Sequence, residues 1–147
     1  MNHKKGFTLI EILIVIGLIA VLAGVLVVAL NPARQFAQAR NAQRYNHVDT
    51  IMGSVINNST DNRGTFTCAA GALPATATNM ADDGYNIGPC LVPTYSAQLP
   101  VDPSAAGAHW TSTTDYDTGY TIMLGTDGRY TIAAPTAELS ETISLTR

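Results

Sequence analysis

Lys4-Lys5-Gly6-Phe7-Thr8-Leu9-Ile10-Glu11 runs directly into an uncharged apolar segment from Ile12 to Leu30. At about 1.5 Å per residue, a helix over that segment covers most of the roughly 30 Å hydrocarbon core of a bilayer. Glu11 lies at the start of the segment, although a charged side chain costs roughly 3 kcal/mol at the centre of a bilayer. The sequence therefore predicts a membrane-spanning helix with a carboxylate that needs a cationic partner.

The stretch Gly6-Phe7-Thr8-Leu9-Ile10-Glu11 resembles the signature of type IV pilins and pseudopilins, in which a short basic leader ends in glycine before an apolar helix. The resemblance implies that a prepilin peptidase cuts between Gly6 and Phe7 and methylates the new N-terminal Phe7. It also implies that Glu11 pairs with the N-terminal amine of a neighbouring subunit. The charge of Glu11 independently requires a nearby cation, so both lines of reasoning agree.

An ordinary secretory signal peptide is the alternative interpretation of this N-terminus. Such a peptide has an apolar region of about 7 to 15 residues that ends at a small-residue cleavage site. Here the apolar run is longer, carries Glu11 at its start and ends in Leu30-Asn31-Pro32. These differences favour a membrane stem.

The distribution of lysine excludes one class of surface fibre. The chain has 8 basic and 11 acidic side chains, and removing residues 1–6 deletes both lysines, which takes the formal net charge from −3 to −5. A covalently linked, sortase-type pilus subunit needs a lysine nucleophile, and no lysine follows Lys5. The sequence therefore favours a fibre held together without covalent links.

Charge counting leaves the membrane orientation open, because Lys4 and Lys5 precede the apolar segment while Arg34, Arg40 and Arg44 follow it. The resemblance implies a leader in the cytoplasm, hence a subunit in the bacterial inner membrane that later reaches an extracellular pilus. Three arginines without interleaved aromatic residues are a weak signal for nucleic acid or lipid headgroups. We expect them to be solvated stem charges that pair with acidic neighbours.

Helical patterning continues beyond Pro32. Apolar residues recur at spacings of three and four, namely at Val48, Ile51, Met52, Val55 and Ile56. We predict one helical stem from Phe7 to about Asn58, with a kink or melted section between Gly17 and Pro32, where glycine and proline weaken a helix. The polar run over residues 57–62 is expected to end the stem.

The predicted fold class is α+β, with a long N-terminal helix, part membrane stem and part amphipathic, packed against a small antiparallel sheet. The predicted organisation is a leader over residues 1–6, a transmembrane or filament-core helix over 7–30, an amphipathic helix over 31–58 and a globular head over 59–147.

Strand patterns are concentrated near the C-terminus. Alternation over Tyr120–Leu124 and Tyr130–Ala133, separated by Gly125-Thr126-Asp127-Gly128, predicts a hairpin. The pattern from Leu139 to Leu145 predicts a third strand. The region between the stem and the hairpin is predicted to be a long connection with at most a short helix near Thr94–Gln98.

Cys68 and Cys90 are the two cysteines of the chain. An even number in an extracytoplasmic head favours one disulfide, which closes a loop of about 20 residues and contributes on the order of 3 kcal/mol. Two free buried thiols are the alternative. A metal site is disfavoured because no histidine lies near either cysteine.

No set of side chains has the pattern of an active site or a cofactor site, so we expect a structural protein and not an enzyme. The spacing of Asp115, Asp117 and Asp127 matches no EF-hand loop. We interpret these residues as turn aspartates, with a calcium loop as the alternative.

The function predicted from the sequence is that of a prepilin, assembled by stem packing into a homo-oligomeric type IV pilus filament. Its expected partners are prepilin peptidase, the pilus or secretion assembly machinery and, before assembly, the membrane. One alternative is a pseudopilin of a type II secretion or DNA-uptake system. A singly anchored surface-binding module is the other, with Trp110, Tyr116 and Tyr120 as its candidate aromatic platform.

Overall fold

The computed structural model describes residues 6–29 and 31–147. The chain divides into two compact units, Met1–Phe36 and Ala37–Arg147. Two long helices come first in the chain and are followed by a small five-stranded antiparallel sheet. The α+β fold class predicted from the sequence is therefore confirmed.

Two helices, α1 (Leu9–Ala29) and α2 (Pro32–Asp61), take the place of the single interrupted stem. Pro32 occupies the first position of α2, where the N–H that proline lacks is not needed. Asn31 caps this helix, since its Oδ1 accepts a hydrogen bond from the main-chain amide of Arg34 at 3.3 Å. The predicted interruption falls at this junction, while both stem glycines lie inside α1.

Helix α2 continues to Asp61, beyond the predicted end at Asn58. The buried amide of Asn58 donates from Nδ2 to the carbonyl oxygen of Thr67 at 3.1 Å and accepts from the Thr67 amide at 2.9 Å. Gly64, with φ 89°, closes the helix end, because its amide donates to the carbonyl of Ser59 at 2.8 Å. Asn58 therefore anchors the following loop and does not break the helix.

The sheet has the strand order β1-β3-β4-β5, and β2 also pairs with β3. Its strands are β1 (Thr78–Ala81), β2 (His109–Ser112), β3 (Asp115–Leu124), β4 (Tyr130–Ala134) and β5 (Ile143–Thr146). The predicted hairpin is formed by β3 and β4, with Ile122 opposite Ile132 and Leu124 opposite Tyr130. The predicted third strand is β5, which pairs with β4.

Three details of the head differ from the prediction. The supposed connection contains β1, a strand of 4 residues that is too short and too polar to show a clear alternation. The short helix is α3 (Gly88–Leu91), and Thr94–Gln98 lies in turns and bends that follow it. Leu139 lies outside β5, in the turn that precedes it, and has φ 59°.

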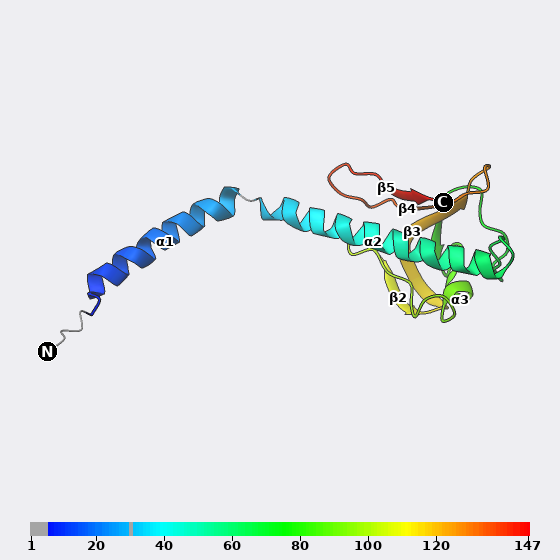
Figure 1. The fold of residues 1–147 in the computed structure, drawn as a ribbon, viewed down its shortest axis with the longest axis horizontal. Helices are drawn as coiled ribbons and strands as arrows, with labels where there is room; N and C mark the ends of the chain where they lie inside the picture. The colour runs from blue at the N-terminus through cyan, green and yellow to red at the C-terminus, as the bar shows by residue number, and fades with distance from the viewer. Residues whose placement is uncertain (1–5, 30) are drawn as a thin grey trace. The chain divides into compact units, whose positions relative to one another are not determined.

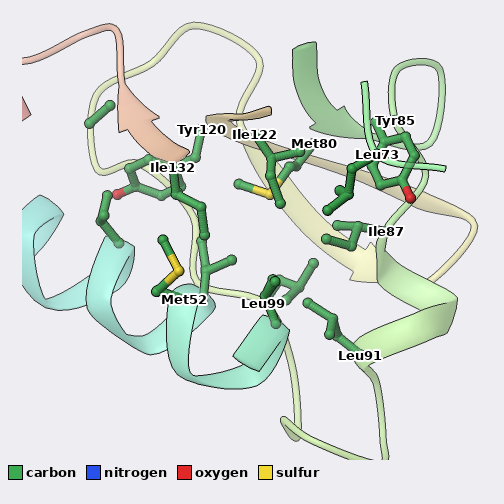
Figure 2. Packing of buried hydrophobic residues seen from close by; sticks show 14 of the residues in the cluster. Met52, Leu73, Met80, Tyr85, Ile87, Leu91, Leu99, Tyr120, Ile122 and Ile132 are labelled. Carbon is green, nitrogen blue, oxygen red and sulfur yellow. The ribbon is translucent and has the colours of Figure 1, made fainter. Parts of the chain in front are cut away.

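The hydrophobic core lies between α2 and the sheet (Figures 1 and 2). Met52 of α2 approaches Ile132 of β4, while Tyr120 and Ile122 of β3 are buried in the same cluster. Each fully buried large aliphatic side chain stabilises the fold by about 1.5–3 kcal/mol relative to an exposed one. The helical stripe read from the sequence is thus the face of α2 that holds the head together.

Cys68 and Cys90 form a disulfide with a Cα–Cα distance of 5.2 Å. The bond links the segment after α2 to helix α3, and the intervening loop carries β1. Nδ2 of Asn58 lies within 3.4 Å of the carbonyl oxygen of Cys90. The end of α2, the loop and α3 are therefore joined at one place.

Candidate functional site

A reciprocal capping box at Thr8 and Glu11 begins helix α1. The amide of Glu11 donates to Oγ1 of Thr8 at 3.2 Å, and the amide of Thr8 donates to Oε2 of Glu11 at 3.4 Å. The two side chains satisfy two amides that the first helical turn would otherwise leave without partners. The cap also holds one oxygen of the Glu11 carboxylate at the main-chain amide of Thr8.

The surface of α1 is apolar on every side. Phe7 is 81% exposed, and the large aliphatic side chains from Leu9 to Val27 are exposed as well. Length and composition make Leu9–Val27 a candidate membrane span. A helix that is hydrophobic all round needs lipid or other helices around it. The apolar helix and its N-terminal sequence are consistent with membrane anchoring.

Gly17 and Gly24 have open space where a side chain would lie, because a Cβ built on either has no neighbour within 4 Å. The described part of the chain therefore does not need glycine at these positions for its own packing. Small residues on an apolar helix allow another helix to approach closely. Both positions are therefore open to the close approach of another apolar helix.

In the head, the buried guanidinium of Arg44 is the centre of an ion cluster. Its side chain is 0% exposed and donates to both oxygens of Asp102, at 2.8 and 3.1 Å. It also donates to Asn41 at 2.8 Å, to Glu138 at 3.0 Å and to Ser104 at 2.6 Å. All five N–H groups of the guanidinium are thus used, and the cluster joins α2 to two loops of the head.

The two carboxylates that bind Arg44, those of Asp102 and Glu138, have pKa values well below their usual range. Burial acts to raise the pKa of Asp102, but hydrogen bonds from Arg44, Thr136 and two backbone amides outweigh burial and lower this pKa to about 2. Hydrogen bonds from Arg40 and then Arg44 lower the pKa of Glu138 to about 2. Both carboxylates are therefore ionised at neutral pH and balance the two arginines.

The expectation of solvated stem arginines is wrong for Arg44, which is completely buried. Arg40 does pair with an acidic neighbour, as expected, since its guanidinium contacts Glu138 at 2.6 Å while remaining partly exposed. Arg34 is exposed. The spacing of Ala37, Asn41, Arg44 and Val48 continues the apolar stripe of α2 toward its start, and this pattern could have placed Arg44 on the buried face.

The three candidate calcium ligands are not brought together. Asp115 begins β3 and contacts His109 at 3.0 Å, whereas Asp127 lies in the turn after β3, where its Oδ1 accepts from the amide of Arg129 at 3.1 Å. Asp117 accepts from Asn79 at 2.9 Å. Over residues 6–29 and 31–147, no three His, Cys, Asp or Glu side chains form a metal-ligating group.

The candidate aromatic platform is not an exposed surface. Tyr116 and Tyr120 are fully buried, and the partly buried Trp110 packs against Tyr116 with ring centroids 5.0 Å apart. The hydroxyl of Tyr120 lies 2.8 Å from Nδ1 of His47. The platform proposed for a surface-binding module is therefore wrong, because two of its three rings form part of the core.

The capping role of Glu11 was not predicted from the sequence, although a signal for it is present. The pattern Thr8-Leu9-Ile10-Glu11 has the Thr-x-x-Glu spacing of a capping box, followed by an apolar run. This signal could have identified the start of α1 at Leu9.

Residues 1–27 match the family model described as the prokaryotic N-terminal methylation motif. No curated protein and no solved structure gives a significant match to the chain.

Proposed function

We propose that this chain, which carries a type IV pilin or pseudopilin prepilin signature over residues 1–27, is a structural subunit of a type IV pilus. Prepilin peptidase cuts it after Gly6 and methylates Phe7. Assembly machinery then moves the processed chain from the bacterial cytoplasmic membrane into a filament of identical subunits at the cell surface. The observation that carries the proposal is the exposed apolar helix α1 with the Glu11 carboxylate at its start.

The capping box supports a pairing role for Glu11. The cap engages Oε2, which orients the carboxylate and leaves its second oxygen available for an incoming amine. An ammonium about 4 Å away attracts a carboxylate far more strongly in an apolar filament core than in water. A subunit docked out of register leaves both charges buried without partners, which is strongly unfavourable. Pairing of Glu11 with a neighbour's N-terminus therefore sets register as well as affinity.

The stem surface supports the polymer in a second way. The same exposed side chains are compatible with lipid before assembly and with neighbouring stems after it. Association between apolar helices depends on close packing, and Gly17 and Gly24 are the open positions at which another stem can approach. We assign no catalytic step, since a pilin-type subunit is structural.

Two variants separate pairing from capping. Glu11→Gln removes the charge but keeps an oxygen that can accept from the Thr8 amide, whereas Thr8→Ala removes the hydroxyl of the cap and keeps the carboxylate. We expect Glu11→Gln to be processed and inserted but to form few filaments, and Thr8→Ala to form filaments. Intact mass and N-terminal sequencing check cleavage and methylation at Phe7, and electron microscopy measures filaments. Abundant normal filaments from Glu11→Gln would refute the pairing role.

The methylation motif is shared with pseudopilins, so the same microscopy tests that alternative. Long surface fibres from the wild-type strain support a pilus. Loss of protein export or of DNA uptake on deletion, without surface fibres, assigns the chain to a secretion or DNA-uptake system. A native chain that retains residues 1–6 would contradict both functions.

A further inference from the structure

The turn between β4 and β5 has an unusual backbone. Leu139 and Ser140 both have φ 59°, and the amide of Glu141 donates to the carbonyl of Glu138 at 3.1 Å. Turns with two successive positive φ angles normally contain asparagine, aspartate or glycine at these positions. A left-handed conformation is unfavourable for other residues, because their Cβ approaches the following carbonyl oxygen too closely. The turn therefore holds strain at two neighbouring residues.

Helix α2 holds this strained turn in place. Asn41 binds both main-chain groups of Glu138, donating to its carbonyl at 2.8 Å and accepting from its amide at 3.0 Å. Arg40 and Arg44 bind the Glu138 carboxylate. Such strain persists only where the surroundings enforce it, and it is concentrated at functional sites. The result is a fixed knob, defined as Leu139, Ser140 and Glu141, whose leucine is 44% exposed.

A socket lies at the other end of the same head. It is a hollow of about 220 Å³ whose lining includes five apolar or aromatic residues, namely Phe66, Ala72, Leu73, Leu124 and Tyr130. Two exposed arginines border it in the chain: Arg63 precedes the lining residue Gly64, and Arg129 lies between the lining residues Gly128 and Tyr130. The socket thus combines an apolar floor with two basic residues beside it. One of them, Arg129, also lies 3.7 Å from the carboxylate of Asp127 in an exposed ion pair, a kind of contact that contributes little.

The knob cannot reach the socket of its own head. Asn41, which holds the knob, and Asp61, which ends α2 next to the socket, are separated by about 30 Å at 1.5 Å per residue. Figure 1 shows the β4–β5 turn beside the earlier part of α2 and the β3–β4 turn near the end of this helix. The two surfaces therefore face different neighbours.

We propose that the knob of one copy docks into the socket of the next copy along the filament, an inference that rests on the proposed function. Leu139 fills the apolar hollow, and Glu141 pairs with Arg129 at its edge. The contact is heterologous, because each copy uses a different surface at each end. Heterologous contacts that do not close into a ring form open filaments. The strained turn thus gains a role as a connection between heads.

Cross-linking in purified filaments tests this contact. Both native cysteines are paired in the disulfide, so a short bis-maleimide reagent reacts with introduced cysteines. The double variant Glu141→Cys with Arg129→Cys should give a ladder of linked subunits on a denaturing gel. Each single variant should give no ladder, and neither should the matched pair Glu141→Cys with Asp83→Cys, which uses an exposed acid outside the socket.

The possible outcomes separate the two proposals. The test begins with the wild-type protein, which must form filaments. If it forms none, both the pilus assignment and the proposed contact are overturned. Filaments of the double variant without a ladder overturn the contact alone. If the double-cysteine variant forms no filaments, variants with reversed charges test the contact instead. Glu141→Arg should lower filament yield at least tenfold, and adding Arg129→Glu should restore the yield. Failure of this restoration overturns the contact.

Discussion

Substitution of Arg44 by methionine tests the buried ion cluster. The variant Arg44→Met leaves Asp102 at a site where its side chain is 0% exposed. The pKa of Asp102 is lowered from 3.8 to about 2 in the folded protein, and at 1.36 kcal/mol per unit this corresponds to roughly 2.5 kcal/mol of stability at neutral pH. Removing one partner of a buried pair typically costs about 3–5 kcal/mol. We therefore expect a loss of about 3 kcal/mol.

Arg40→Met is the matched control. It removes an arginine from the same helix and the same cluster, but the side chains of Arg40 and Glu138 are 34% and 28% exposed. Exposed ion pairs contribute about 0–1 kcal/mol. The control should thus change the free energy of unfolding by no more than about 1 kcal/mol.

Urea unfolding of the full chain in detergent, followed by Trp110 fluorescence, measures both variants. Trp110 is suited to this because it packs on the buried ring of Tyr116. A further variant that combines Arg44→Met with Asp102→Asn should recover part of the loss, because it removes the second buried charge and keeps an oxygen that can accept from the Ser104 and Ala105 amides. If Arg44→Met unfolds within about 1 kcal/mol of Arg40→Met, the reasoning about the cluster is wrong.

Three further predictions concern the head. Replacing Cys68 and Cys90 by serine should lower the free energy of unfolding by about 3 kcal/mol, as measured by urea titration with and without reductant. Asn58→Ala leaves main-chain groups of the following loop without partners and should cost about 1–3 kcal/mol, with faster hydrogen exchange in that loop. Burial lowers the pKa of His47 from 6.5, so its contribution to stability is full above about pH 6.5 and falls as the pH decreases. The pKa of Asp102 is lowered from 3.8 to about 2, so its contribution to stability is full above pH 3.8 and is lost as the pH falls toward 2. Unfolding curves at a series of pH values should show the separate losses of stability that protonation of His47 and of Asp102 causes.

Periodicity predicted the main elements of the fold. Apolar spacing located the buried face of α2, and alternation around a glycine-rich turn located the β3–β4 hairpin. Pro32 placed the interruption of the stem, because proline is tolerated at the first position of a helix but not in its interior. These features depend on residues close together in the sequence, so they can be predicted from one sequence alone.

Contacts between residues that are far apart in the sequence could not be predicted from local patterns. The partner of Arg44 is Asp102, 58 positions away in the sequence, and no local pattern predicts that such a pair will be buried. Strand β1 forms because β3 offers it a partner, not because its 4 residues favour a strand. Asn58 was interpreted from its tendency to favour turns, whereas its fold-specific contacts with Thr67 keep it in a helix.

The cap at Thr8 and Glu11 suggests how assembly can be followed chemically. A chain cut after Gly6 contains no lysine, so its single primary or methylated amine is the one at Phe7, a residue that is 81% exposed in the isolated subunit. Amine-directed reagents would then label each free subunit once, at the atom that Glu11 of a neighbour is proposed to cover. The loss of labelling would report the incorporation of subunits in real time, without any introduced dye site or tag.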